Sequence, residues 1–161
     1  MKRVLELPAD DGVSLRVLLT AGHGADLPGI GQLPPHVHVE AWVPQADVLA
    51  GASLVVCHGG SGTVFGALAA GVPLVCVPLF ADQPVNALLV AEAGAGLAVT
   101  PTGGPADDSA VLGPDDVSRI RSAARLLLKE PSYRARAGRL ADEMRATTTC
   151  RELISTLDPC S

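Results

Sequence analysis

A glycine-rich bend near the middle of the chain carries the residues best suited to bind a phosphate group. An apolar run at 53–57 leads into His58, glycines at 59, 60 and 62, and the hydroxyls of Ser61 and Thr63. Such a run, followed by a bend and an amphipathic segment, predicts a buried strand leading into a helix. Glycines let the backbone approach a ligand closely, because they carry no Cβ atom. The N–H groups at the helix start would face that ligand, and the helix dipole favours an anion there by about 0.3–1 kcal/mol.

Polar and aromatic residues on either side of the bend could bind the other parts of a ligand that carries the phosphate. An aromatic ring offers a flat surface for a base, and polar groups offer hydrogen bonds for hydroxyls. Trp42 lies in a polar, proline-bounded stretch and can stack under a pyrimidine, which contributes roughly 1–3 kcal/mol. Asp82 and Gln83 follow a second apolar run and carry the acceptors and donors that a pyranose requires.

Each of these residues also has a structural interpretation. Trp42 could fill the core at the end of a strand, and Asp82 could cap the helix that follows it. Ser61 or Thr63 could serve as an N-cap, a role compatible with binding phosphate. Asn86 is expected to support the loop.

Four ordered submotifs make the chain resemble a known family. Trp-x-Pro-Gln, His-x-Gly-x-Gly-Thr, Gly-Val-Pro and Asp-Gln-x-x-Asn occur in this order between residues 42 and 86. This order resembles the nucleotide-sugar signature of family 1, UDP-glycosyltransferase-like enzymes with the GT-B fold, of the bacterial natural-product type. The resemblance covers only their C-terminal, donor-binding half.

The resemblance implies roles for individual residues. The backbone of Val43 would contact the base edge, Gln45 the ribose, and His58 the phosphates, helping the diphosphate to leave. The full predicted set of nucleotide-sugar contacts is Trp42, Val43, Gln45, His58, Gly60, Ser61, Gly62, Thr63, Asp82 and Gln83.

Two features depart from the family pattern. Many members carry a glutamate for the ribose hydroxyls at the position of Gly66, so ribose binding must be rearranged here. In the resembled enzymes a histidine of the N-terminal domain deprotonates the acceptor, and that domain is absent from this chain. His23, His36 and His38 are not positioned to replace it, so we assign no catalytic residue. The resemblance also implies a metal-independent reaction without a cofactor.

The order of elements predicts an α/β fold. Short aliphatic strands are expected at 15–20, 37–42, 53–57, 73–79 and 96–100. Their alternation with helices indicates βαβ units and a Rossmann-like parallel sheet flanked by helices, which by resemblance is the C-terminal half of a GT-B fold. The strand at 53–57 is expected to be central. The alternation of the strand at 37–42 predicts either a position nearer an edge or one partly solvated face. By resemblance, the first strand of the usual donor domain is missing.

The helices are predicted from their apolar stripes. The helix at 62–70 is expected to bury Val64, Phe65, Leu68 and Ala69, and the next helix Val85, Leu88, Leu89 and Ala93. A helix starting at Pro114 should bury Val117, Ile120, Ala124, Leu127 and Leu128. After Pro131 a second stripe comprises Tyr133, Ala137, Leu140, Ala141 and Met144, and a short third one Leu153, Ile154 and Leu157.

Composition sets wider limits. The 161 residues fit a single domain, 1–161, and the net charge of −5 without a basic cluster argues against a nucleic-acid partner. No apolar run approaches the ~20 residues of a membrane span, and no signal-peptide core is present, so a cytoplasmic location is expected. Cys57, Cys76, Cys150 and Cys160 form no Cys-x-x-Cys pair and are expected to be reduced thiols. The paired aspartates at 10–11, 107–108 and 115–116 adjoin turn residues and are expected to be solvated caps rather than metal ligands.

The sequence therefore predicts the donor-binding part of an inverting glycosyltransferase. The enzyme would move a hexose from a UDP- or TDP-sugar to a hydroxyl of a small acceptor, with an antibiotic as the suggested class. The acceptor site would come from the missing N-terminal domain or a separate subunit, and the isolated domain should bind without turnover. Two alternatives are a stand-alone nucleotide-sugar-binding subunit and a GT-B-like nucleotide-sugar epimerase. A dinucleotide-binding dehydrogenase is disfavoured, because the chain lacks Gly-x-Gly-x-x-Gly with a downstream acid.

Overall fold

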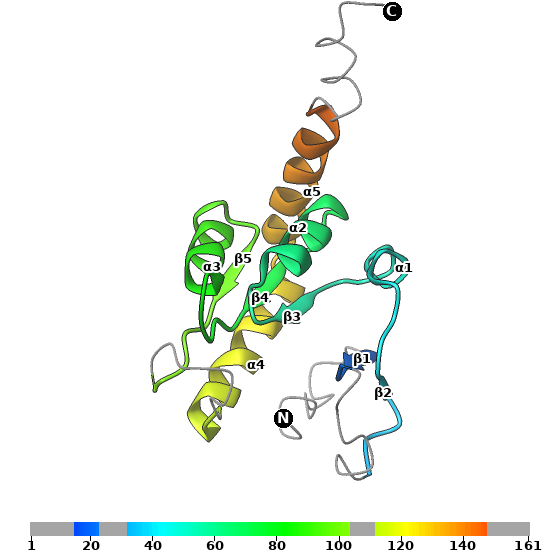
Figure 1. Cartoon of the computed structure of the whole chain (residues 1–161), viewed down its shortest axis with the longest axis vertical. Helices are drawn as coiled ribbons and strands as arrows, with labels where there is room; N and C mark the ends of the chain where they lie inside the picture. Colours follow the sequence, from blue (N-terminus) through cyan, green and yellow to red (C-terminus); the bar gives the residue numbers. More distant parts are fainter. Residues whose placement is uncertain (1–14, 23–31, 104–111, 148–161) are drawn as a thin grey trace, which may run out of the picture.

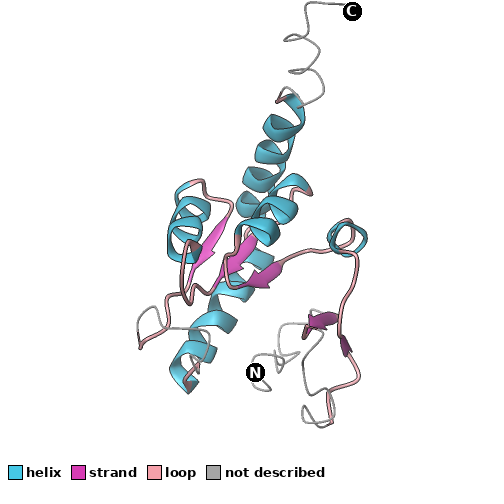
Figure 2. Cartoon of the chain, viewed as in Figure 1, coloured by secondary structure: helices cyan, strands magenta, loops and turns pink. Residues whose placement is uncertain are grey.

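The fold is described by a computed structural model of residues 15–22, 32–103 and 112–147 (Figure 1). Several predictions fall outside these residues: the helix end within 2–11, the loop at 104–111, the third closing helix, His23, Cys150 and Cys160. From β2 to α4 the described strands and helices alternate along the chain, and Figure 2 shows both kinds of element. None of its helices is long and apolar enough to cross a membrane.

The described strands form two parallel sheets. In one, β1 (Val17–Thr20) pairs with β2 (Val37–Glu40). In the other, the order is β3 (Val55–Cys57), β4 (Leu74–Cys76) and β5 (Gly96–Ala98). The prediction of parallel strands in βαβ units is confirmed.

The prediction that the strand at 53–57 is central is wrong. Among the described strands β3 pairs only with β4, so it is the edge of its sheet. The strand at 37–42 is at an edge as predicted, because β2 pairs only with β1. The continuous sheet expected from the sequence is thus divided between β1 and β3, and no described strand joins the two parts.

Helices cover both faces of the three-stranded sheet. The helices are α1 (Gln45–Leu49), α2 (Ser61–Ala69), α3 (Gln83–Glu92), α4 (Pro114–Lys129) and α5 (Pro131–Ala146). Leu74 and Cys76 of β4 point to one face, where they pack with residues of α1, α2 and α3. Val75 points to the other face and packs against α4. The completely buried β4 is therefore the centre of the core.

The buried faces of α2 and α3 differ from those predicted. In α2, Val64 and Ala67 are buried while Phe65 is exposed. In α3, Ala87 and Val90 are buried, while the predicted stripe of Val85, Leu88 and Leu89 is exposed. Small alanines let these helices lie close to the sheet, so the larger apolar side chains point outward. In α4 the prediction is confirmed for four of its five residues; Leu128 is only half-buried.

The fully buried residues of α5 are likewise few. Ala137 and Ala141 are buried as predicted, whereas Tyr133 and Leu140 are half-buried and Met144 is exposed.

Two cysteines lie opposite each other within the three-stranded sheet. Cys57 of β3 and Cys76 of β4 are partners in the parallel register, and both are free thiols as predicted.

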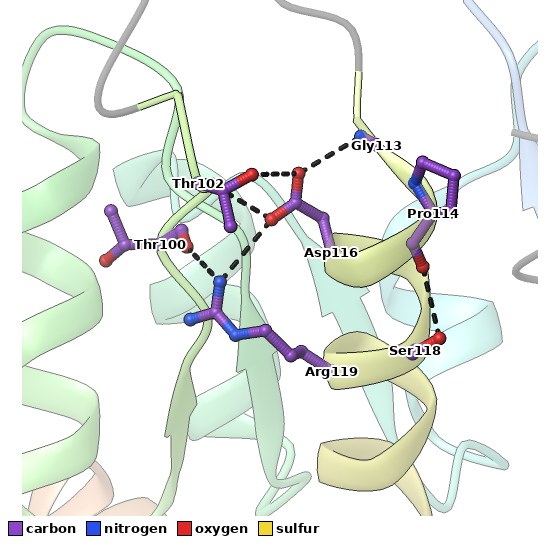
Figure 3. Close-up of polar contacts among 7 residues, drawn as sticks. All are labelled: Thr100, Thr102, Gly113, Pro114, Asp116, Ser118 and Arg119. Carbon is purple, nitrogen blue, oxygen red and sulfur yellow. Dashed lines mark hydrogen bonds and ion pairs between the residues drawn. The ribbon is translucent and has the colours of Figure 1, made fainter.

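Asp116 links the start of α4 to Thr102, in the segment that follows β5 (Figure 3). Its carboxylate accepts hydrogen bonds from the Thr102 N–H at 2.9 Å and the Gly113 N–H at 3.0 Å. The Thr102 hydroxyl and Arg119 also contact it, and Arg119 donates to the Thr100 carbonyl at 2.8 Å. The expectation that this aspartate is a helix cap is confirmed, but the expectation that it is solvated is wrong, because its side chain is buried.

This network predicts a pH-dependent stability. The Thr102 N–H, aided by that of Gly113, holds the pKa of Asp116 below its ordinary value. The stabilisation is therefore complete above the unfolded-state pKa, about 4, and is lost as the pH falls through the lower folded-state value. Asp116→Asn should lower the free energy of unfolding at pH 7 and lose less stability on acidification than the unmodified chain. Urea unfolding between pH 7 and pH 2 measures this difference. Asp115→Asn, an exposed change in the same helical turn, is the control, and identical pH profiles for the two variants would contradict the expectation.

Candidate functional site: a phosphate-binding loop at the carboxyl end of the sheet

The predicted phosphate loop lies between β3 and α2. His58 directly follows β3, and its side chain is exposed. Helix α2 begins at Ser61 with Gly60 as its N-cap, and no side chain makes a capping hydrogen bond there. No N-cap side chain therefore accepts a hydrogen bond from the N–H groups of the first turn. Because backbone N–H groups and the helix dipole both favour anions, this terminus suits a phosphate.

Close neighbouring atoms leave no room for a side chain at two positions of the loop, Gly59 and Gly60. Gly59 has φ +87°, and a Cβ atom on it would lie 3.2 Å from the Gln83 carbonyl oxygen. A Cβ atom on Gly60 would lie 2.5 Å from Nε2 of His58. The His58 imidazole therefore lies directly above the backbone of Gly60, next to the start of α2.

Gly60→Ala is expected to displace the His58 ring, because both cannot occupy this space. The ring can rotate outward, so the fold should change by less than about 0.5 kcal/mol. Nucleoside diphosphate affinity should fall by about tenfold, as one charge-assisted contact is lost. Histidine NMR signals and calorimetry measure the two effects. Gly51→Ala, at a site with open space around it, is the control. An unmoved His58 signal would contradict the prediction.

Hydrogen bonds connect the phosphate loop to the predicted sugar-binding residues. The Ser61 hydroxyl donates to Oδ2 of Asp82 at 2.6 Å. The Asn86 amide donates to the same oxygen at 2.9 Å and to the Gly59 carbonyl at 2.9 Å. The expectation that Asn86 supports the loop is confirmed.

Asp82 is held by these bonds as an exposed carboxylate. Hydrogen bonds from Ser61 and then Asn86 keep its pKa below the ordinary value. Asp82 occupies the N-cap position of α3, but its side chain makes no capping hydrogen bond. The alternative interpretation, in which Asp82 caps this helix, is therefore not observed. The preceding residue, Ala81, has φ 56°, an uncommon conformation for a residue other than glycine. Backbone strain of this kind concentrates at functional sites and fixes the direction of a neighbouring side chain.

Gln83 has a structural role that the sequence did not reveal. It is buried, with 4% of its surface exposed. Its Oε1 accepts hydrogen bonds from the N–H groups of Leu79 at 2.9 Å and Phe80 at 3.1 Å. A sugar contact by Gln83 stays a prediction, and it would use the amide nitrogen because the oxygen is engaged by the loop.

The predicted base and ribose contacts lie before and within α1. Trp42 is 61% exposed, so the alternative in which it fills the core is wrong. Val43 follows it, and Gln45 begins α1. A Cβ atom on Gly66 of α2 would lie 3.0 Å from Oε1 of Gln45. The Gln45 side chain thus lies over the position where many members of the resembled family carry glutamate.

The structure therefore joins most of the predicted residues into one region. Hydrogen bonds link Ser61 to Asp82, and packing places His58 over Gly60 and Gln45 next to α2. Gly62 and Thr63 lie in the first turn of α2, whereas Trp42 and Val43 lie on the segment leading from β2 to α1. That all ten residues contact a nucleotide sugar remains a prediction. In the described part of the chain, no three His, Cys, Asp or Glu side chains are grouped so as to hold a metal ion.

A family profile matches this chain from residue 12 to residue 159. Its description is "Erythromycin biosynthesis protein CIII-like, C-terminal domain". The chain belongs to this family. The match covers almost the whole chain, and the predicted resemblance to bacterial natural-product glycosyltransferases is confirmed.

Two relatives from Streptomyces are named as sugar transferases. The elloramycin glycosyltransferase ElmGT of Streptomyces olivaceus is 45% identical over 135 residues, which cover 84% of this chain and 31% of the relative. The L-demethylnoviosyl transferase of Streptomyces niveus is 39% identical over 116 residues, covering 72% of this chain and 27% of the relative. The chain thus spans about a third of the length of these relatives.

Solved structures show the same relationship. The calicheamicin glycosyltransferase CalG4 matches with a TM-score of 0.74 and 30% identity, covering 89% of this chain and 34% of CalG4. The glycosyltransferase SnogD from Streptomyces nogalater matches with a TM-score of 0.70 and 30% identity, covering 92% of this chain and 36% of SnogD. The predicted fold class, a Rossmann-like α/β domain of GT-B glycosyltransferases, is confirmed.

Proposed function

We propose that this chain binds a nucleotide sugar and forms the donor half of an inverting glycosyltransferase. The donor would be a UDP- or TDP-hexose and the acceptor a hydroxyl of a small molecule. The observation that carries the proposal is the start of α2, which has no side-chain cap, lies beneath the exposed His58 and is hydrogen-bonded through Ser61 to Asp82. Membership of the family supports it.

The site suggests how each part of the donor is held. The diphosphate would lie against the first-turn N–H groups of α2 and accept a hydrogen bond from His58. The hydrogen bonds from Ser61 and Asn86 both go to Oδ2 of Asp82, so Oδ1 would be the oxygen that binds a sugar hydroxyl. Trp42, exposed at the end of the segment after β2, would stack on the pyrimidine.

The reaction would be a direct displacement at the anomeric carbon. The acceptor oxygen forms a bond to that carbon while the bond to the diphosphate oxygen breaks, and the acceptor proton passes to a base. The helix amides and His58 would stabilise the charge that develops on the departing diphosphate. The base would come from an acceptor domain or subunit outside this chain, and no metal ion or cofactor is required in this scheme.

The names of the relatives favour this function over the two alternatives. They include a tylactone mycaminosyltransferase and a 10-deoxymethynolide desosaminyltransferase, both from Streptomyces. We therefore propose an antibiotic aglycone as the acceptor class. Neither a nucleotide-sugar epimerase nor a stand-alone nucleotide-sugar-binding subunit that needs a partner acceptor subunit is favoured.

The proposal is tested by comparing how tightly the chain binds a nucleoside and the corresponding nucleoside diphosphate. We expect UDP or TDP to bind the chain at least about tenfold more tightly than the corresponding nucleoside, because the phosphates add charge-assisted hydrogen bonds. His58→Ala should remove most of this difference while leaving nucleoside affinity unchanged. Isothermal calorimetry measures both, and His38→Ala, an exposed histidine on β2, is the matched control. Equal binding of nucleoside and nucleoside diphosphate would contradict the proposal.

A further inference from the structure

Two thiols lie next to each other at the carboxyl end of the three-stranded sheet. Cys57 and Cys76 end the neighbouring strands β3 and β4, where they are partners in the parallel register (Figure 1). Adjacent strands lie about 4.8 Å apart, and the Cα atoms of a disulfide usually lie about 4.4–6.8 Å apart. The spacing of the two strands therefore suits a bridge between these residues.

The two side chains point to the same face of the sheet. Cys76 belongs to the core cluster that α1, α2 and α3 cover, and Cys57 packs against this cluster. The Cys57 sulfur accepts a hydrogen bond from the Cys76 thiol. Because the sulfur atoms are already in contact, only a small side-chain movement separates the two free thiols from a covalent bridge.

The two thiols differ in exposure and acidity. Cys57 is half-buried, whereas Cys76 is completely buried. The hydrogen bond from Cys76, aided by the Gly59 N–H, holds the pKa of Cys57 below its ordinary value, while the same contact and burial raise the pKa of Cys76. Redox-sensitive cysteines are typically the more accessible and more acidic of two neighbouring thiols. An oxidant would therefore react first with Cys57.

We propose that Cys57 and Cys76 form a peroxide-sensitive thiol pair that closes to a disulfide in the folded chain. The Cys57 thiolate attacks one peroxide oxygen, and the O–O bond breaks as hydroxide leaves, which gives a sulfenic acid at Cys57. The Cys76 sulfur then attacks the Cys57 sulfur, and the S–O bond breaks as the S–S bond forms. In sum, each cysteine loses one electron, and two thiols and one peroxide give one disulfide and two waters.

The bridge would lie next to the phosphate loop. His58 directly follows Cys57, and a Cβ atom on Gly59 would lie 3.7 Å from Cβ of Cys76. The Val77 N–H donates to the Cys57 carbonyl at 2.8 Å, which joins the two backbones at this point. Oxidation is therefore expected to change the surroundings of His58. The inference rests on the pairing of β3 with β4 and does not depend on the proposed function.

Peptide mapping of the full chain after treatment with hydrogen peroxide tests the proposal. Chymotrypsin, which cleaves after Phe65, places Cys57 and Cys76 on different peptides. The two peptides should be joined without reductant and separate with it. Dimedone, which traps sulfenic acids, should capture no more than about a tenth of the oxidised chains, because the adjacent Cys76 reacts faster than a reagent from solution. In a chain unfolded by urea, most of the Cys57 sulfenic acid should be trapped instead.

Two variants assign the roles of the thiols. In Cys76→Ala, dimedone should label Cys57 at least about tenfold more than in the unmodified chain, because the second thiol is gone. In Cys57→Ala, the matched control within the pair, Cys76 should stay unlabelled because it is completely buried. Circular dichroism checks that both variants fold, and the map of the unmodified chain requires neither of them.

Three results would overturn the proposal. They are the absence of joined peptides, bridges that connect Cys57 or Cys76 mainly to Cys150 or Cys160, and equal dimedone labelling of Cys57 with and without Cys76. Histidine NMR spectra give a further measurement, in which the His58 signal should shift when the bridge forms and return when it is reduced. An unmoved His58 signal in a bridged chain would contradict a bridge beside the phosphate loop.

Discussion

Replacing Gly96 with alanine is expected to lower the free energy of unfolding by about 3 kcal/mol. A Cβ atom at this position would overlap the carbonyl oxygen of Leu74 and lie 2.7 Å from Cγ1 of Val90. The backbone cannot retreat easily, because Gly96 is the register partner of Leu74 in the pairing of β5 with β4. Either β5 must separate from the central strand or α3 must move away from the sheet. Urea unfolding followed by circular dichroism measures the loss.

Gly103→Ala is the matched control for this substitution. Gly103 has no atom within 4 Å of the Cβ position, so its replacement should change stability by less than about 0.5 kcal/mol. Equal stability of the Gly96 and Gly103 variants would contradict the observed packing of β5 between Leu74 and Val90.

Replacing Trp42 with alanine is expected to weaken binding of a pyrimidine nucleoside diphosphate by roughly tenfold to a hundredfold, the value of one base stacked on an aromatic ring. The side chain is 61% exposed, so the fold should lose less than about 0.5 kcal/mol. Calorimetric titration and thermal unfolding separate the two effects. Leu126→Ala, an exposed apolar change on α4, controls for surface effects. Unchanged nucleotide affinity in the Trp42 variant would show that the base binds elsewhere.

The class of fold could be predicted because its signals are local. A short apolar run, a turn and a helix repeat along the chain, and each unit folds as the pattern indicates, with His58 after β3 and Ser61 at the start of α2. The cap at Asp116 was predictable for the same reason, because it lies within the first turn of α4. Local chemistry determines these features whatever the rest of the protein does.

The buried helix faces could not be predicted from apolar spacing alone. In α3 the residues that face the sheet are Ala87 and Val90, whereas Leu88 and Leu89 point away. The close contact of Val90 with Gly96 explains why. A helix that lies this near the backbone of a strand has room only for small side chains, and the partner glycine is distant in sequence.

The position of β3 was mispredicted because the apolar composition of a strand does not reveal which strands it pairs with. The run at 53–57 is as apolar as an interior strand, yet Val56 is 47% exposed at an edge. A central position requires a neighbour on both sides, and the described residues supply only β4.

The site residues were proposed from the order of the submotifs, but their mutual contacts were not predictable. No local rule indicates that the Ser61 hydroxyl donates to Asp82, 21 residues further along the chain. The buried role of Gln83 and the positive φ of Ala81 were equally hidden, because both depend on how the segment after β4 turns back toward the phosphate loop.

Calorimetric titration of the folded chain with UDP, TDP and NAD tests the central claim most directly. We predict that at least one pyrimidine diphosphate binds at a single site, that NAD does not bind, and that both Trp42→Ala and His58→Ala weaken the binding. Binding of NAD would contradict this account, as would absence of diphosphate binding by a chain shown to be folded.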